Sequence, residues 1–261
     1  MPEADAFYVP EDDRFIPTEW ARGPWSPEAQ HGGPPSALVA RAIEALEGPG
    51  EMQLARFTIE ILQPVPISPL RVEARAVRTS RRVQFAEAVL SADSGEVARA
   101  SAWRILRTEA DSAEIALEPT PHPPPEDCPA FRKYEPPWSP SYMDANEWRS
   151  ARGHFLEAGP AAAWVRMNVD LVQGEPVSPA GRALVAADSG NGISATLPID
   201  RFLFINTELT VHLVRPPEGE WVCLDAVTRI GPRGTGVAQS ALWDRRGRVG
   251  AGAQALLVWP R

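Results

Sequence analysis

The chain contains an internal repeat in which two similar stretches lie a constant 152 residues apart. Residues 57–64 read FTIEILQP and residues 209–216 read LTVHLVRP, so that the apolar positions and the closing proline coincide. The same offset superposes residues 94–97 on residues 246–249, with no gap between the two matches. Because the sequence of one supersecondary unit occurs twice, the chain should fold as two copies of the same structural unit.

Each copy predicts four β-strands. Residues 52–63 and 204–215 alternate between apolar and polar side chains and then stop at a proline. Glycine-containing turns at 93–95 and 244–247 predict that the last two strands of each copy form hairpins. The remaining predicted strands are 69–79, 82–92 and 96–106 in the first copy, and 221–231, 234–243 and 248–259 in the second.

A helix is predicted before the strands of each copy. Residues 34–47 begin with two prolines, are rich in alanine and leucine, and end at a Gly-Pro pair. This segment is apolar almost all round, so it should be buried. Residues 183–188 form the shorter counterpart and are followed by glycines. A helix packed on one face of an antiparallel sheet is an α+β arrangement.

The copies are separated by a proline-rich segment. Residues 119–140 contain nine prolines, which remove backbone donors and fix φ, so this segment should be an extended connector outside both sheets. We therefore expect an N-terminal unit at 1–108, a linker at 109–150 and a C-terminal unit at 151–261.

The composition excludes several classes of function. With a net charge of −8 and scattered arginines, the chain has no basic surface suited to nucleic acid. Cys128 and Cys223 form no disulfide framework or zinc spacing, and four unpaired histidines argue against a metal site. No apolar run could span a membrane, and the acidic first ten residues do not resemble a signal peptide, so a cytoplasmic protein is expected. A G-x-S-x-G elbow of serine hydrolases is also lacking.

At this point the residues resemble a known family. The stretches 31–38 (HGGPPSAL), 62–65 (LQPV), 83–88 (VQFAEA), 209–217 and 252–254 (GAQ) are similar to the double-hotdog acyl-CoA thioesterase II-like family. The resemblance implies a tandem hotdog fold, in which each half is an antiparallel sheet wrapped around a central helix. It also implies an acyl-CoA substrate, a role in fatty acid metabolism and no metal or prosthetic cofactor. Since hotdog sheets have exposed edge strands, a homodimer of double hotdogs is expected.

The resemblance also suggests site residues. The family's Asp, Thr (or Ser) and Gln of the second hotdog fall on Asp188, Asn206 and Gln254, so that an asparagine stands where the family has a hydroxyl. Thr207 adjoins Asn206, and a slip of one residue would turn the opposite face of the strand to the site. A carboxylate can activate water as a general base, and amide groups can orient the water or a carbonyl oxygen. Backbone N–H groups at a helix start would add positive potential.

The repeat allows an internal comparison. An offset of 152 places Ser36, Leu54 and Ala102 of the first copy opposite Asp188, Asn206 and Gln254. Because the polar residues occur in one copy only, we predict one active site per chain.

Other interpretations remain open. Asp188 could cap a turn, Gln254 could lie exposed on a strand, and the glycines around residues 190–192 could form a simple loop. A non-catalytic acyl or acyl-CoA binding protein is the main alternative. A hydratase or dehydratase would need a catalytic histidine, or an aspartate and histidine pair, near the central helix. His31 beside Gly32 and Gly33 could face the site, but as an isolated histidine it is expected to stabilise a turn.

Overall fold

The computed structural model describes residues 5–108, 117–155 and 157–261. The helices and short 3₁₀ turns are α1 (Gly33–Glu44), α2 (Pro179–Ala187), α3 (Gly190–Ile193), η1 (Glu19–Ala21) and η3 (Pro125–Asp127). The strands are β1 (Ala6–Glu11), β2 (Arg14–Pro17), β3 (Met52–Ile61), β4 (Arg71–Thr79), β5 (Val83–Ala92), β6 (Gly95–Leu106), β7 (Asn146–Arg152), β8 (Ala161–Met167), β9 (Asp170–Val172), β10 (Phe202–Asn206), β11 (Glu208–Leu213), β12 (Val222–Ile230), β13 (Thr235–Asp244) and β14 (Gly247–Pro260).

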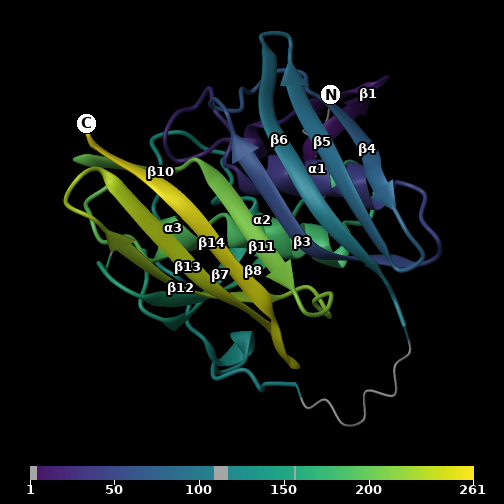
Figure 1. Cartoon of the computed structure of the whole chain (residues 1–261). Helices are drawn as coiled ribbons and strands as arrows, with labels where there is room; N and C mark the ends of the chain where they lie inside the picture. Colours follow the sequence, from purple (N-terminus) through teal and green to yellow (C-terminus); the bar gives the residue numbers. More distant parts are fainter. Residues whose placement is uncertain (1–4, 109–116, 156) are drawn as a thin grey trace.

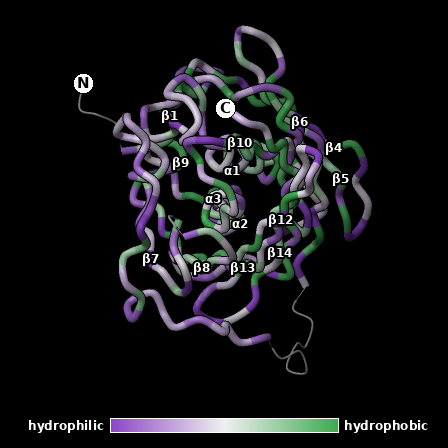
Figure 2. Tube along the Cα trace, turned by 90° about the vertical axis from the view of Figure 1, so that its left-hand side faces the viewer, coloured by the Kyte–Doolittle hydropathy of each residue, from purple (hydrophilic) through white to green (hydrophobic). Residues whose placement is uncertain are grey.

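One antiparallel sheet joins the two copies. Its strands follow the order β4-β5-β6-β3-β11-β14-β13-β12-β8-β7, and β10 pairs with β14 beyond the end of β11. The sheet curves around α1, α2 and α3, which lie in the centre of the molecule (Figures 1 and 2). A smaller sheet, β2-β1-β9, lies beside it. The predicted tandem hotdog fold is therefore confirmed.

The repeat is visible at the middle of the large sheet. Strands β3 and β11 pair so that Thr58 lies opposite Thr210, its equivalent 152 residues later. The offset exchanges the two neighbouring pairs, Ile59 with Leu209 and Phe57 with Val211, because Phe57 corresponds to Leu209 and Ile59 to Val211. A pseudo-two-fold axis therefore passes between the two threonines, and the predicted strand offset is confirmed.

The strand predictions need two corrections. Residues 204–215 are not one strand, because the chain breaks at Thr207 into β10 and β11. The second copy also has three strands that were not predicted: β7 and β8, which extend the large sheet beyond β12, and β9, which lies in the smaller sheet. Residues 161–165 of β8 are buried without alternation, so they lack the period of two that marks a half-exposed strand.

The two central helices run antiparallel. Gly32 at the start of α1 lies against Asp188 at the end of α2, while the Glu44 carboxylate accepts a hydrogen bond from Ser178 at the other end, at 2.7 Å. Ala37 and Gly181 meet between them. Nine of the twelve residues of α1 are buried, as its apolar sequence predicts.

The helices do not keep the strand offset. Their first residues, 33 and 179, are 146 positions apart, and their last residues, 44 and 187, are 143 apart. Several residues have been added between the helix and the central strand of the second copy, where α3 and β10 lie. The counterpart of Asp188 is therefore the end of α1, at Glu44 or Ala45, and the assignment of Ser36 by the offset of 152 was wrong.

The proline-rich segment covers the outer face of the second half. The carbonyl of Pro123 accepts a hydrogen bond from Trp164 of β8 at 2.8 Å, and Cys128 is buried against this face together with Cys223. Both cysteines are free. The first part of the predicted linker, 109–116, and residues 1–4 of the N-terminal unit lie outside the described residues.

The division at 108/109 and 150/151 stays a prediction. Strand β7 runs across the second of these positions, and the sheet is continuous between the copies. None of the helices in the described ranges has the length and hydrophobicity needed to cross a membrane.

Candidate active site

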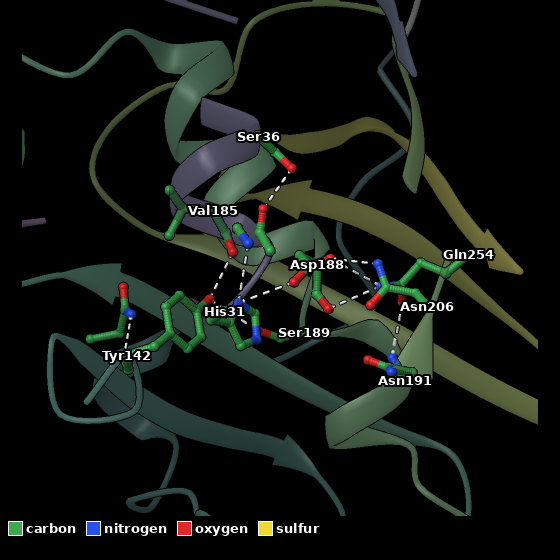
Figure 3. Close-up of polar contacts among 12 residues, drawn as sticks. His31, Ser36, Tyr142, Val185, Asp188, Ser189, Asn191, Asn206 and Gln254 are labelled. Carbon is green, nitrogen blue, oxygen red and sulfur yellow. Dashed lines mark hydrogen bonds and ion pairs between the residues drawn. The ribbon is translucent and has the colours of Figure 1, made fainter. Parts of the chain in front are cut away.

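Asp188 ends helix α2 in the centre of the molecule. It is the C-cap residue, and only 3% of its surface is exposed. A buried carboxylate needs hydrogen-bond donors, because an unpaired buried charge is costly. Strands β10 and β14 supply these donors, and His31, directly before α1, contacts the second carboxylate oxygen (Figure 3).

Two amide side chains donate to this carboxylate. Asn206 Nδ2 lies 2.9 Å from Asp188 Oδ1, and Gln254 Nε2 lies 3.3 Å from the same oxygen. The sequence predicted these three residues as one group, and the structure brings them together. The side-chain oxygen of Asn206 bonds to none of the described residues, so it can accept a further hydrogen bond.

Hydrogen bonds fix both the nitrogen and the oxygen of the Gln254 side-chain amide. Its Nε2 also donates to the backbone oxygen of Asp188 at 3.0 Å, and its Oε1 accepts the N–H of Asn191 at 3.1 Å. The residue is 1% exposed. Residues 190–193, expected as part of a loop, form the short helix α3, and the bond from Asn191 fixes the orientation of the Gln254 amide. Gln254 therefore positions Asp188.

Thr207 does not join this group. Its side chain is exposed, and its hydroxyl contacts the backbone oxygen of Ala255 at 3.4 Å. Successive residues of an extended chain point to opposite faces, so Asn206 and Thr207 cannot both face Asp188. Of the two sequence alternatives, it is Asn206 whose side chain reaches the carboxylate.

Two glycines allow these groups to approach. A Cβ atom on Gly32 would lie 2.8 Å and 2.9 Å from the two Asp188 carboxylate oxygens. A Cβ on Gly190 would lie 2.7 Å from Ser240 Oγ and 2.9 Å from Gln254 Oε1. Glycine is needed at both positions for close contact, since any larger residue would separate the parts of the site.

His31 also lies at the site, although the sequence interpretation preferred a turn-stabilising role for it. Its Nδ1 lies 3.1 Å from Asp188 Oδ2, so the histidine of the first copy meets the carboxylate of the second. Burial lowers the pKa of His31, and the Asp188 charge opposes this shift. His31 does stabilise the turn, because its Nδ1 accepts the N–H of Gly33 at 3.1 Å. The expectation that it is isolated was wrong, because it also contacts Asp188. Its position directly before Gly32 was the available signal.

Tyr142 holds the His31 ring in place. The two rings stack with centroids 3.6 Å apart and planes 6° apart. The phenol donates to the backbone oxygen of Val185 at 2.7 Å and shares a hydrogen bond with Ser189 at 2.9 Å. Burial raises the pKa of Tyr142 well above its ordinary value, so the phenol stays protonated.

A pocket of about 480 Å³ leads to Asp188. It lies where the sheet parts, between β10 and the segment after β3, at residues 61–65. The side chains around it are mostly apolar, with aromatic rings from Trp25, Tyr134, Trp148, Phe155 and Phe204. Its described lining contains no lysine or arginine. The polar groups converge at one end, as in ligand sites that bury an apolar group and fix a polar one.

The opposite end of the helix pair has a different structure. Arg104 donates to the backbone oxygens of Glu44 and Leu46 at 3.0 and 2.8 Å, and to Gln84 Oε1 at 2.7 Å. These bonds satisfy carbonyl groups at the C-terminus of α1. The end of α1 that corresponds to Asp188 is therefore filled by structural contacts.

Both halves of the chain match known family models. Residues 21–105 match the acyl-CoA thioesterase N-terminal domain, and residues 125–258 match the acyl-CoA thioesterase C-terminal domain. No curated protein sequence gives a significant match.

Several solved structures share the whole fold. A hot dog fold protein of Alicyclobacillus acidocaldarius is 21% identical, with a TM-score of 0.73 over 99% of this chain and 97% of that chain. The tesB protein of Mycobacterium avium is 15% identical, with a TM-score of 0.70 over 95% and 93%. The acyl-CoA thioesterase II of Mycobacterium marinum is 11% identical, with a TM-score of 0.65 over 96% and 93%. At these identities the likeness concerns the fold.

Proposed function

The chain belongs to the acyl-CoA thioesterase family, and on this basis we propose that it hydrolyses a fatty acyl-CoA thioester at one site per chain. The observation that carries the proposal is that Asp188 and Asn206 line the polar end of an apolar pocket and are joined there by a hydrogen bond, while the buried Gln254 donates to Asp188 from behind. We assign the acyl chain to the apolar part of this pocket and the thioester to its polar end.

Asp188 is the proposed base. It takes a proton from a water molecule as the water oxygen attacks the thioester carbonyl, a role worth roughly 10²–10⁴-fold in rate. The tetrahedral intermediate then collapses, the C–S bond breaks, and the leaving thiolate takes the proton from Asp188, which gives the fatty acid and CoA. The free oxygen of Asn206 is available to accept the second proton of that water in a hydrogen bond. Gln254 acts through Asp188, whose carboxylate it orients. Asparagine can thus serve where the family has a hydroxyl.

The start of α1 offers a donor for the oxyanion. Gly32 is the N-cap residue and lies on the pocket beside Asp188. Its N–H bonds to no acceptor among the described residues, and the N-terminus of a twelve-residue helix favours negative charge. A backbone donor aimed at a developing oxyanion contributes roughly 10²–10³-fold.

The described lining of the pocket is mostly apolar and contains no lysine or arginine, so it suits the acyl chain better than the phosphates of CoA. We therefore expect the CoA nucleotide to bind outside this pocket, with the pantetheine arm reaching in. A homodimer, a cytoplasmic location and a role in fatty acid metabolism remain predictions that accompany the proposal.

Two other functions have been considered. A non-catalytic binding protein would not require the three polar residues to converge, so their contacts favour hydrolysis. A hydratase requires a histidine and a carboxylate near the central helix, and the contact between His31 and Asp188 meets that requirement. Hydration of a 2-enoyl-CoA is accordingly the second candidate.

A thiol-release assay over short to long acyl-CoA substrates tests the proposal. The wild type should release CoA, and Asp188→Asn should reduce the rate by about 10²–10⁴-fold. Asp200→Asn is the matched control, because Asp200 is an exposed carboxylate near the same pocket. Absence of thiol release across the series, with loss of enoyl-CoA absorbance instead, would support the hydratase. Inactivity in both assays would favour the binding protein.

A further inference from the structure

His31 is a polar residue of the pocket to which the proposed function gives no role. It precedes α1 in the first copy and reaches the carboxylate of the second. The side chain is 11% exposed, and the ring lines the pocket. The contacts of its two nitrogens differ, and this difference determines which nitrogen carries the proton (Figure 3).

Nδ1 is an acceptor. The backbone N–H of Gly33 donates to it at 3.1 Å, with the alignment of a hydrogen bond. Asp188 Oδ2 lies 3.1 Å from the same nitrogen, but this contact does not have the alignment of a hydrogen bond. Since a neutral imidazole has one donor and one acceptor nitrogen, acceptance at Nδ1 places the proton on Nε2.

Nε2 is open to the pocket. It has no hydrogen-bond partner among the described residues, and it is not sealed in the core. The stacked ring of Tyr142 prevents the imidazole from tilting, so the direction of Nε2 is fixed. A rigid N–H donor facing a pocket has a ligand acceptor as its natural partner.

We propose that His31 is a catalytic residue that donates a hydrogen bond from Nε2 to the thioester carbonyl oxygen and stabilises the oxyanion together with the Gly32 N–H. No proton is transferred from His31 in this role, and Asp188 remains the base. The inference rests on the proposed hydrolysis. It adds a residue from the first copy to a site otherwise built mainly by the second.

The environment of His31 agrees with a neutral donor. Asp188 from α2 and the phenol of Tyr142 are the titratable groups that contact the ring. Burial lowers the pKa of His31 more than the carboxylate raises it, so the ring is neutral near pH 7.

Three variants test the proposal by acyl-CoA hydrolysis. His31→Phe keeps a ring to stack on Tyr142 but has no donor, and it should lower kcat by about 10²–10³-fold with little change in KM. His31→Gln can place an amide N–H near the position of Nε2. Because an amide donates a hydrogen bond without transferring a proton, this variant should recover at least a tenth of the wild-type kcat. Tyr142→Phe keeps the stacked ring but loses the phenol bonds to Val185 and Ser189, so it should lower kcat less than His31→Phe does.

The outcomes separate the roles. Equal loss in His31→Phe and His31→Gln would overturn the proposal in favour of proton transfer or a structural role. Full activity in His31→Phe would exclude any catalytic role. Wild-type inactivity would contradict the proposed hydrolysis itself, which is a distinguishable result.

Nitrogen-15 NMR of the histidine side chains gives a readout that is independent of activity. In the full-length protein, the His31 signals, assigned by their loss in His31→Gln, should show a neutral ring protonated at Nε2 near pH 7. A charged ring, or one protonated at Nδ1, would overturn the proposal whether or not the protein is active.

Discussion

Asn206 donates its side-chain amide to Asp188 at 2.9 Å while its own oxygen remains free. A threonine hydroxyl at the same position could also donate to Asp188 and would keep lone pairs for another donor. The two residue types can therefore satisfy the carboxylate in the same way. They differ in reach, because the asparagine side chain is longer by one atom.

The rate of thiol release in Asn206 variants should depend on whether the new side chain keeps a donor and an acceptor. Asn206→Thr should keep the rate of thiol release within about tenfold of wild type, whereas Asn206→Leu should lower it by about 10²-fold, since it removes both the donor and the acceptor. Leucine is the residue of the first copy at this strand position, Leu54. Rates are measured with the best acyl-CoA substrate of the wild type.

Thr207→Val is the control for this series. The Thr207 side chain is exposed and directed to Ala255, so its removal should change the rate by less than about threefold. A large loss in Thr207→Val together with an active Asn206→Leu would mean that the strand is shifted by one residue in the working enzyme.

Gly32→Ala should damage activity more than stability. The backbone of Gly32, with φ −68° and ψ −15°, suits alanine, so no conformational strain arises. The added methyl group would nevertheless press on both Asp188 oxygens and push the carboxylate away from Asn206. A displacement near 1 Å costs on the order of 10²-fold in rate. Thiol release and the melting temperature are measured together, and unchanged activity would show that the carboxylate can move freely.

The sequence predicted the sheet better than the site because sheet signals are local. Alternation and hairpin glycines define β3 to β6, and the repeated prolines after the central strands preserved the offset. Asp188, Asn206 and Gln254 were identified by resemblance to a family, and their contacts support that assignment.

Two features could not be predicted for a physical reason. His31 reaches Asp188 only because α1 and α2 pack antiparallel, and no local pattern encodes a contact between residues so far apart. The insertion before β11 was hidden because the matched strands all follow the helix of their copy, so their offset does not report the length of the connection between helix and first strand. This is why Ser36 was mistaken for the counterpart of Asp188.

Arg215→Met should destabilise the fold. Arg215 bonds both oxygens of Asp244 at 2.5 and 2.6 Å, and Asp244 is fully buried. Removing the guanidinium leaves a buried carboxylate without its counter-ion, which costs about 3–5 kcal/mol. The change is measured by urea unfolding near neutral pH. Arg246→Met is the control, because its ion pair with Glu218 is exposed, and it should leave the unfolding midpoint nearly unchanged.

The effect of Arg215→Met should depend on pH. Burial raises the pKa of Asp244, but the bonds from Arg215 and from backbone N–H groups outweigh it, so the folded pKa lies below the ordinary value. The pair's contribution is therefore complete above a pH of about 4 and is lost as the pH falls through the folded pKa. The difference in unfolding free energy between wild type and variant should shrink below pH 4. A difference that grows on acidification would contradict the assigned role of Asp244.

Arg104→Met tests whether the end of α1 is only structural. This variant removes the bonds to the carbonyls of Glu44 and Leu46 and to Gln84, and leaving these buried groups unsatisfied should cost about 2–3 kcal/mol of unfolding free energy. The catalytic rate should stay within about twofold, because the twelve residues of α1, at a rise of about 1.5 Å each, separate this end from Gly32 and Asp188 by nearly the length of the helix. Urea unfolding and thiol release are measured on the same preparation. If thiol release is lost while the protein remains folded, the Glu44 end takes part in the reaction, and the assignment of one active site per chain is wrong.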